Sequence, residues 1–169
     1  TEGGLFALDA DGEATRISDF VPSGATVALD GSGWVVEAES GNIFRIDPVS
    51  EQVELIDVGG GASSLTPGPD SLWFIAGSAA HRFDLDSGEI TNGPMVEGPS
   101  LQLSPAVGGA WLTTRAETPM LYFLDDRLDI LSQVELPGVP DAPIVIGDRM
   151  FLSLTRDGAT VLEFRTVGG

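Results

Sequence analysis

Apolar and polar residues alternate with a period of two along short stretches of the chain. The stretches 42–47 (NIFRID) and 52–56 (QVELI) show this clearly, and the pattern is typical of half-buried β-strands. The breaks carry turn-forming pairs: Asp11-Gly12, Asp30-Gly31, Asp70-Ser71, Ser87-Gly88 and Asp157-Gly158. No window has apolar residues at helical spacing, and 22 Gly with 11 Pro leave little room for a helix. The pattern predicts an all-β protein.

The strand pattern itself repeats about every forty residues. An aromatic residue within an apolar run recurs at Trp34, Trp73, Trp111 and Phe151, at spacings of 39, 38 and 40 residues. A second series places an acidic residue after an apolar one, just before a turn: Leu8-Asp9, Ile46-Asp47, Phe83-Asp84 and Leu124-Asp125. A repeat of this length, built from four short strands, predicts a β-propeller of four-stranded antiparallel blades.

We name the strands of each expected blade A to D, from the innermost to the outermost. The expected strands are C and D of a first part-blade at 5–9 and 13–20; A to D of three complete blades at 25–29, 34–38, 42–47 and 52–58, at 63–66, 72–76, 81–85 and 89–97, and at 101–104, 110–114, 120–125 and 129–136; and A to C of a last part-blade at 144–146, 150–154 and 160–165. The chain is therefore a single domain, 1–169, of about four blade-equivalents. We expect the four repeated aromatic residues to form its core with the aliphatic residues of the A strands.

Two interpretations of ring closure remain open at this point. In the first, the N-terminal strands pair with the C-terminal ones and close four blades, which leaves one C strand redundant. In the second, the chain is part of a ring of about six to eight blades. Its open edges are then covered by another chain or by further sequence, because uncovered sheet edges aggregate. The chain begins with Thr and not Met, so we expect a processed or cut chain, which favours the second interpretation.

The composition is strongly acidic and excludes several classes of partner. Eight Arg, no Lys and 26 Asp plus Glu give a net charge of −18, which repels nucleic acid and anionic bilayers. No apolar run is long enough to span a membrane. Solubility of a secreted protein and adaptation to high salt both explain the acidity. There is no Cys, and therefore no disulfide framework.

A family resemblance lies in Gly41–Phe74, which contains Ile46-Asp47-Pro48 followed by Gly68-Pro69-Asp70-Ser71-Leu72-Trp73. This stretch resembles the propeller repeats of the streptogramin lyase-like and NHL/YncE-like superfamily. Those repeats pair an Ile-Asp-Pro-x-(Ser/Thr)-Gly turn with a Gly-Pro-Asp-x-Leu-Trp strand entry. The resemblance covers nearly the whole chain and implies the architecture, whereas the superfamily hosts many unrelated functions.

The lyase resemblance also implies catalysis by a pair of histidines with a nearby glutamate and a bound Mg²⁺. This chain has one histidine, His81, at the repeat position of Phe6, Phe44 and Tyr122. An aromatic position within a strand favours packing, so we expect a structural histidine and transfer no catalytic residue. No Gly-x-Ser-x-Gly elbow and no nucleotide-binding glycine motif is present.

The Asp-rich turns at 9–13 and 84–89 resemble the start of a calcium loop. A complete loop has a bidentate Glu at its twelfth position, where this chain has Phe20 and Met95. Hairpin turns explain these residues better. We therefore expect no bound metal and no cofactor.

The candidate binding face carries the loops between strands B and C and the connections from strand D to the next strand A. Its polar residues are Glu37, Glu39, Arg115, Glu117, Arg156 and Asp157. Arginine offers a planar fork for a carboxylate or phosphate group, and two of the eight Arg lie on corresponding loops. The alternative is an ordinary solvated rim.

These observations favour a non-catalytic ligand- or protein-binding or sensor module. We expect it in an extracellular or extracytoplasmic location, on the periplasmic or cell-wall side. Its partner would be a protein or small molecule on the B–C and D–A loop face, and self-association or a second chain could complete the ring. The alternative is a fragment or relative of a metal-dependent lyase-like propeller enzyme.

Overall fold

The chain is built from β-strands throughout. The computed structural model of the chain describes residues 4–8, 11–27, 31–98, 102–146, 149–156 and 158–165. These residues form 18 strands. No helix in this described part is long and apolar enough to cross a membrane. The predicted all-β class is confirmed.

The strands form five antiparallel sheets in chain order. The first sheet contains β1 (Leu5–Leu8) and β2 (Ala14–Ser18). Three sheets are complete blades, with strands A to D as follows: β3 (Pro22–Val27), β4 (Gly33–Glu37), β5 (Ile43–Ile46) and β6 (Val53–Ile56); β7 (Ala62–Pro67), β8 (Ser71–Ala76), β9 (Ala79–Asp84) and β10 (Ile90–Met95); β11 (Gln102–Ala106), β12 (Gly109–Thr113), β13 (Met120–Asp125) and β14 (Ile130–Glu135). The last sheet contains β15 (Val139–Pro140), β16 (Ile144–Ile146), β17 (Arg149–Arg156) and β18 (Gly158–Arg165).

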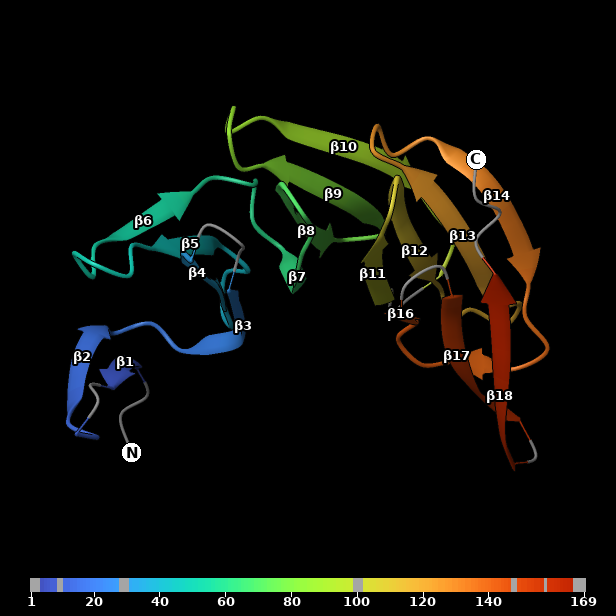
Figure 1. Cartoon of the computed structure of the whole chain (residues 1–169), viewed down its shortest axis with the longest axis horizontal. Coiled ribbons are helices and arrows are strands. Elements are labelled where there is room, and N and C mark those ends of the chain that lie inside the picture. The colour runs from blue at the N-terminus through green and yellow to red at the C-terminus, as the bar shows by residue number, and fades with distance from the viewer. Residues whose placement is uncertain are drawn as a thin grey trace.

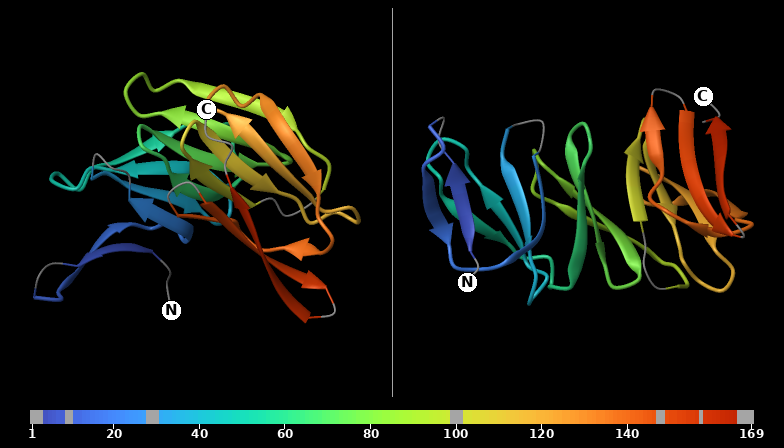
Figure 2. Two further views of the ribbon diagram at one scale, coloured as in Figure 1. Left: turned by 45° about the vertical axis from the view of Figure 1, so that its right-hand side comes forward. Right: turned by 90° about the horizontal axis from the view of Figure 1, so that it is seen from below.

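The five sheets follow one another around an open arc. In Figure 1 the β1–β2 sheet and the β15–β18 sheet lie at the two ends of this arc. The second view of Figure 2 shows the successive sheets side by side along the long axis of the molecule. Within the described residues, β1 and β2 pair only with each other. The chain is therefore a partial propeller, and closure of four blades by pairing of the two ends is not what the structure shows.

The last sheet differs in detail from the expected one. No strand was expected between 136 and 144, but Val139 and Pro140 pair with Thr155 and Leu154 of β17. β16 pairs with the same edge of β17 farther along. Together β15 and β16 form an inner strand interrupted at 141–143, where Pro143 has no N–H group to donate to a ladder. Both β15 and β16 can pair with β17 because β17 is eight residues long and extends past β16.

The core lies between successive sheets, not inside any one of them. Trp34 packs against the second complete blade, Trp73 against the third, and Trp111 against the last sheet. The buried residues of the three clusters are, in order, Trp34, Val36, Ile43, Ala62, Leu72, Phe74 and Phe83; Trp73, Ile75, Ala80, Val96, Leu103, Ala110, Leu112, Tyr122, Leu124 and Leu128; and Trp111, Leu121, Leu136, Met150, Leu152 and Leu154. Strands such as β12 are buried at every position because a neighbouring sheet covers each of their faces.

Phe151 has a different environment from the three tryptophans. It was expected in the core, but it is half-buried and belongs to none of the three clusters. It pairs with Ile144, and Ile144 and Ile146 are 60% and 64% exposed. Alternation places these three side chains on the face of the last sheet that points away from the third blade. No further sheet covers that face among the described residues, so the aromatic residue cannot be buried there.

The inner strands are also joined by a repeated hydrogen bond. The hydroxyl of Thr66 on β7 donates to the carbonyl of Leu103 on β11, at 3.4 Å. At the equivalent position of the next blade, the hydroxyl of Ser104 donates to the carbonyl of Pro143. These bonds satisfy polar groups where the inner strands approach one another. They hold neighbouring blades in a constant relative position.

The position of Trp73 gives a test of this packing. Replacing Trp73 with Ala should lower the free energy of unfolding by about 3–5 kcal/mol, because the side chain is buried and its removal leaves a cavity. Trp73 is 2% exposed. Phe151→Ala is a matched control at the same repeat position, where the face is open, and it should cost much less. Urea denaturation followed by circular dichroism measures both. Equal losses would contradict the assignment of the clusters.

Candidate functional site

The two ends of the sheets differ in their polar chemistry. One end carries the A–B and C–D turns within the blades. The other end carries the B–C loops and the D–A connections, which we call the loop face. Only side chains that have no structural partner are free to bind a ligand.

Carboxylates at the turn end cap the C–D turns. Oδ1 of Asp47 accepts hydrogen bonds from the N–H groups of Val49 and Ser50, at 2.9 and 2.7 Å. Oδ1 of Asp125 accepts bonds from Arg127 and Asp129 at 2.9 Å each. These bonds are Asx-turns. The repeated acidic residue found in the sequence therefore closes a tight turn.

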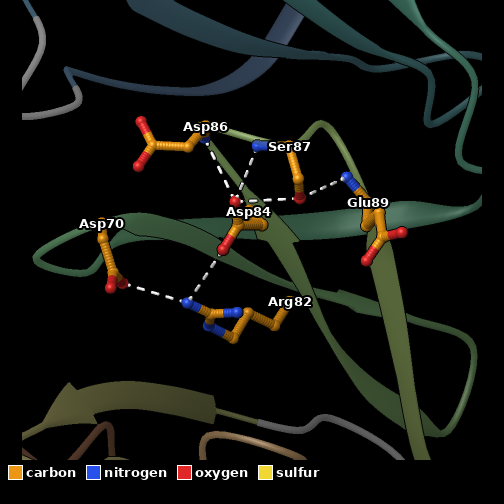
Figure 3. A network of polar contacts seen from close by, with 6 residues as sticks. All are labelled: Asp70, Arg82, Asp84, Asp86, Ser87 and Glu89. Carbon is orange, nitrogen blue, oxygen red and sulfur yellow. Dashed lines mark hydrogen bonds and ion pairs between the residues drawn. The ribbon is translucent and has the colours of Figure 1, made fainter.

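Asp84 makes the most extensive of these contacts, shown in Figure 3. Its Oδ1 accepts bonds from the N–H groups of Asp86 and Ser87, at 3.2 and 2.8 Å, and from the Ser87 hydroxyl at 3.0 Å. Its Oδ2 lies 3.4 Å from the guanidinium of Arg82, which also contacts Asp70 at 3.0 Å. Arg82 is only 13% exposed, so it joins the A–B and C–D turns of one blade.

These bonds stabilise the charged form of the carboxylates. The N–H of Ser87, then its hydroxyl, and to a lesser extent the N–H of Asp86 and Arg82, hold the pKa of Asp84 below its usual value. The N–H groups of Ser50 and Val49 likewise hold the pKa of Asp47 below its usual value. Oδ1 of Asp84 is thus engaged by the turn itself, and Oδ2 lies beside Arg82. Asp9, the start of the other Asp-rich turn, lies outside the described residues.

His81 has a packing role, as expected. Its ring stacks on Phe74 with centroids 5.0 Å apart, and its Nδ1 lies 2.8 Å from Oδ1 of Asn92 on the neighbouring strand. No three His, Asp or Glu side chains of the described part of the chain gather into a metal-binding group. The described residues therefore offer no group that fits the Mg²⁺ site implied by the family resemblance.

The loop face is tied together by its backbone. In each complete blade the D–A connection donates a hydrogen bond to the B–C loop: Gly61 to Ser40, Val96 to Ser78, and Leu136 to Pro119, at 3.0, 2.9 and 2.8 Å. The approach at the first of these is close, since a Cβ at Gly41 would lie 2.6 Å from the Gly61 nitrogen. The loops are therefore held in fixed positions on one face, as predicted for a propeller.

The expected site residues fall into three groups. Glu37, whose carboxylate accepts a bond from Ser40, and exposed Glu39 lie at the β4–β5 loop of the first complete blade. Arg115 and Glu117 lie in the β12–β13 loop, two blades away. Arg156 ends β17 with a side chain outside the described ones, and Asp157 is likewise not described. The first and second groups therefore lie on blades that are not neighbours.

Arg115 is used to join two blades. Its Nε donates to the carbonyl of Pro140 at 3.0 Å, and its guanidinium lies 2.9 Å from Asp141. Both partners belong to the beginning of the last sheet. The arginine therefore fixes the β12–β13 loop, and Glu117, two residues later, is exposed.

Glu117 lies between two hollows of the surface. The first, which we call the Tyr122 groove, has a volume of about 560 Å³ and lies between β10 and the outer strands of the third blade; its principal residues are Met95, Glu97, Glu117, Met120, Tyr122 and Ile130. The second, of about 480 Å³, lies between the third blade and the last sheet and includes Glu117, Pro137, Val139 and Thr155. The β12–β13 loop separates them.

Sequence reasoning placed Glu117 on a loop but singled out no other residue of the Tyr122 groove as a site residue. Met95 and Ile130 belong to outer strands of different blades, 35 positions apart in the numbering. Tyr122 was considered only as the repeat equivalent of His81. Burial, and secondly Glu97, raises the pKa of the Tyr122 hydroxyl, which keeps it protonated as a hydrogen-bond donor. The sequence did offer one signal for the groove: Met95, an apolar residue, lies close to Glu97 in the connection that follows β10.

The chain resembles known proteins in structure and not in sequence. No family profile and no curated protein matches the sequence. Among solved structures, a catalytically inactive variant of virginiamycin B lyase from Staphylococcus aureus with quinupristin matches with a TM-score of 0.72 and 17% identity, over 98% of this chain and 64% of the lyase. The fold is a streptogramin lyase-like β-propeller. The predicted propeller fold is thereby confirmed.

Two further propellers show how widely this fold is shared. TolB from Acinetobacter baumannii matches with a TM-score of 0.70 and 18% identity, over 98% of this chain and 47% of TolB. The extracellular domain of the putative one-component system BT4673 from B. thetaiotaomicron matches at 0.72 and 14%, over 95% and 25%. This chain thus spans less than two thirds of each of these proteins, and at such identities the likeness concerns the fold.

The turn cap at Asp84 predicts a pH-dependent stability. Asp84→Asn should lower the melting temperature at neutral pH, because the amide loses the charge that Ser87 and Arg82 stabilise. The folded-state pKa lies below the unfolded value of about 3.9. The stabilisation is therefore complete above that value and is lost as the pH falls through the folded pKa. Thermal unfolding at a series of pH values should show the gap between wild type and variant closing below about pH 4.

Asp86→Asn is the matched control for this prediction. Its carboxylate points away from the network in Figure 3, so this variant should melt close to the wild type at every pH. A gap for Asp84→Asn that stays constant down to low pH would contradict the turn-cap account.

Proposed function

We propose that this chain is a non-catalytic binding or sensor module with an extracytoplasmic location. Its ligand, a protein or small molecule, occupies the loop face. The observation that carries the proposal is the β12–β13 loop, which Arg115 fixes to Pro140 and Asp141 and which presents Glu117 between two hollows. A rigid scaffold with exposed polar loops is the usual arrangement of a binding surface.

Two further observations support the proposal. His81, the residue that a lyase-like mechanism would need first, is engaged by Phe74 and Asn92. The extracellular domain of BT4673 is part of a putative one-component system, so a propeller of similar fold serves there outside the cell. An acidic surface with 26 carboxylates agrees with such a location, since charge favours solubility.

We also propose that a further blade of the same repeat covers the open face of the last sheet. The three internal clusters show what covers each equivalent face: an inner strand with a small or apolar residue and a second strand with apolar residues facing the aromatic side chain. Phe151, Ile144 and Ile146 present the same kind of face without a cover. Such a blade would be supplied by a second chain or by more of the protein.

A ligand on the loop face should protect that face from hydrogen exchange. We expect at least one compound from a library of peptides and small metabolites to raise the melting temperature with increasing concentration. Slowed exchange should then appear at 38–42, 96–98 or 114–119 and not in the turns at 48–51 and 105–108. Protection confined to the turns would contradict the choice of face. A library without any stabilising ligand would contradict the binding function.

The open face predicts concentration-dependent association of the isolated chain. Exposed apolar surface of this kind associates in water, so light scattering should show a mass that rises with concentration. Ile146→Glu places a charge on the face and should restore a monomer, whereas Val49→Glu, at a 91% exposed turn position, should not. A chain that remains monomeric without substitution would contradict the need for a covering blade.

A further inference from the structure

The Tyr122 groove has an apolar wall that no other part of the described chain covers. Met95 ends β10 and is 83% exposed. Ile130 lies across from it on β14, and both side chains line the groove together with Met120 and Tyr122. Leu124 pairs with Ile130 and Tyr122 pairs with Gln133, so the groove residues of β13 and β14 lie on one face of the sheet.

The rim of the groove is acidic. Glu97 follows β10 and Glu117 lies in the β12–β13 loop, and no Arg lines the groove. Within the described residues neither carboxylate takes part in a hydrogen bond or an ion pair, unlike Asp84, Asp70 and Asp141. The two acidic residues flank a close approach, since a Cβ at Gly98 would lie 2.9 Å from the Cβ of Ala116. This contact fixes their separation.

The edge of the groove offers unpaired backbone. β14 is the outermost strand of its sheet, and all six of its residues are exposed, including Leu131 and Val134. Exposed apolar edge strands are usually protected by proline, lysine or a bulge. β10 contains Gly93 and Pro94, whereas β14 has neither proline nor lysine in its sequence ILSQVE. The pairing of β14 with β13 shifts register once, between Phe123 and Leu124, so residues 132–135 are the regularly paired part of this edge. An extended peptide can add to such an edge through main-chain hydrogen bonds.

We propose that the Tyr122 groove binds an extended peptide segment of a partner protein, in which an arginine or lysine lies two residues from an aliphatic side chain. That spacing places both side chains on one face of a strand. The aliphatic side chain contacts Met95 and Ile130, and the cation lies between Glu97 and Glu117. The net charge of −18 attracts such a segment from a distance. The inference rests on the proposed function and names the chemistry of the partner.

Other candidates are less well supported. The hollow between the outer strands of the first and second complete blades contains Arg45, Glu54 and Asp57. Because it has both positive and negative side chains, it favours neither a cationic nor an anionic ligand. The hollow beside Pro137 shares Glu117 with the groove and has less apolar surface to hold a side chain. The acidic turns use their carboxylates internally.

The test uses two synthetic peptides of identical composition. In the first, acetyl-Thr-Arg-Thr-Leu-Thr-Arg-Thr-amide, each arginine lies two residues from the leucine. In the second, both arginines are adjacent to the leucine, so that cation and aliphatic group face opposite sides of a strand. Isothermal titration calorimetry at about 0.15 M salt, where long-range attraction is largely screened, should show binding of the first peptide and at least about fivefold weaker binding of the second.

Three variants of the whole chain locate the contact. Glu97→Gln with Glu117→Gln should weaken binding of the first peptide about three- to tenfold, as expected for exposed charge pairs. Met95→Arg, at an exposed position, should weaken it at least tenfold by placing a cation in the groove. Glu51→Gln with Glu89→Gln removes the same two charges from exposed turns at the opposite end, and should change binding by less than about twofold. Circular dichroism confirms that each variant is folded.

Several outcomes would overturn the inference. One is equal binding of the two peptides; another is an equal loss in the groove and turn variants, which would indicate general charge attraction. The inference would also be overturned if the first peptide did not bind at concentrations up to about 1 mM, since a weaker affinity would be too low for specific recognition. These results leave the proposed function standing, since it is tested separately by exchange protection with any ligand. Failure to find any ligand for the loop face would overturn both.

Discussion

Burial of one aromatic side chain between each pair of successive sheets is the interaction on which this structure depends. Trp34, Trp73 and Trp111 each leave their own sheet and pack into the next one. A four-stranded sheet of this kind has two apolar faces and therefore cannot be stable in water by itself. Stability arises only when the sheets are stacked in order. The half-buried Phe151 shows what happens where the stack ends.

The same stacking separates the two ends of the sheets into different roles. At the turn end, Asp47, Asp84 and Asp125 close short connections with their own side chains, and Arg82 links two turns. At the loop face the backbone makes the links, from Gly61 to Ser40 and at equivalent positions. Carboxylates such as Glu97 and Glu117 are consequently left free at this face, which is why a ligand is expected there and not at the turns.

The propeller fold itself does not select a function, because binding and catalytic proteins share it. The distinction depends on particular residues. His81 contacts Phe74 and Asn92 in the position that other repeats give to an aromatic residue, and the described residues offer no metal-binding group. The loop face, by contrast, combines a rigid backbone with an apolar groove and an acidic rim. These are the features from which the recognition of a cationic partner is proposed.

The sequence by itself determined most of the strands, their order and the propeller fold. Period-two alternation and the recurrence of Trp34, Trp73 and Trp111 are local or regularly spaced signals, and they are readable because every blade solves the same packing problem. The role of His81 followed from the same repeat. The candidate site was only partly predictable: the loop position of Glu117 could be read from the sequence, but the ion pair of Arg115 with Asp141 and the lining of one groove by both Met95 and Ile130 could not.

Only the tertiary structure decided which of these side chains are free. Arg115 and Asp141 belong to different sheets, and whether they meet depends on the angle at which one sheet packs on the next. The exposure of Phe151 and Ile146 depends on whether another sheet follows, and the repeat pattern is the same in either case. A local pattern specifies which face of a strand is apolar, whereas contact between sheets is set by the packing of all of them together.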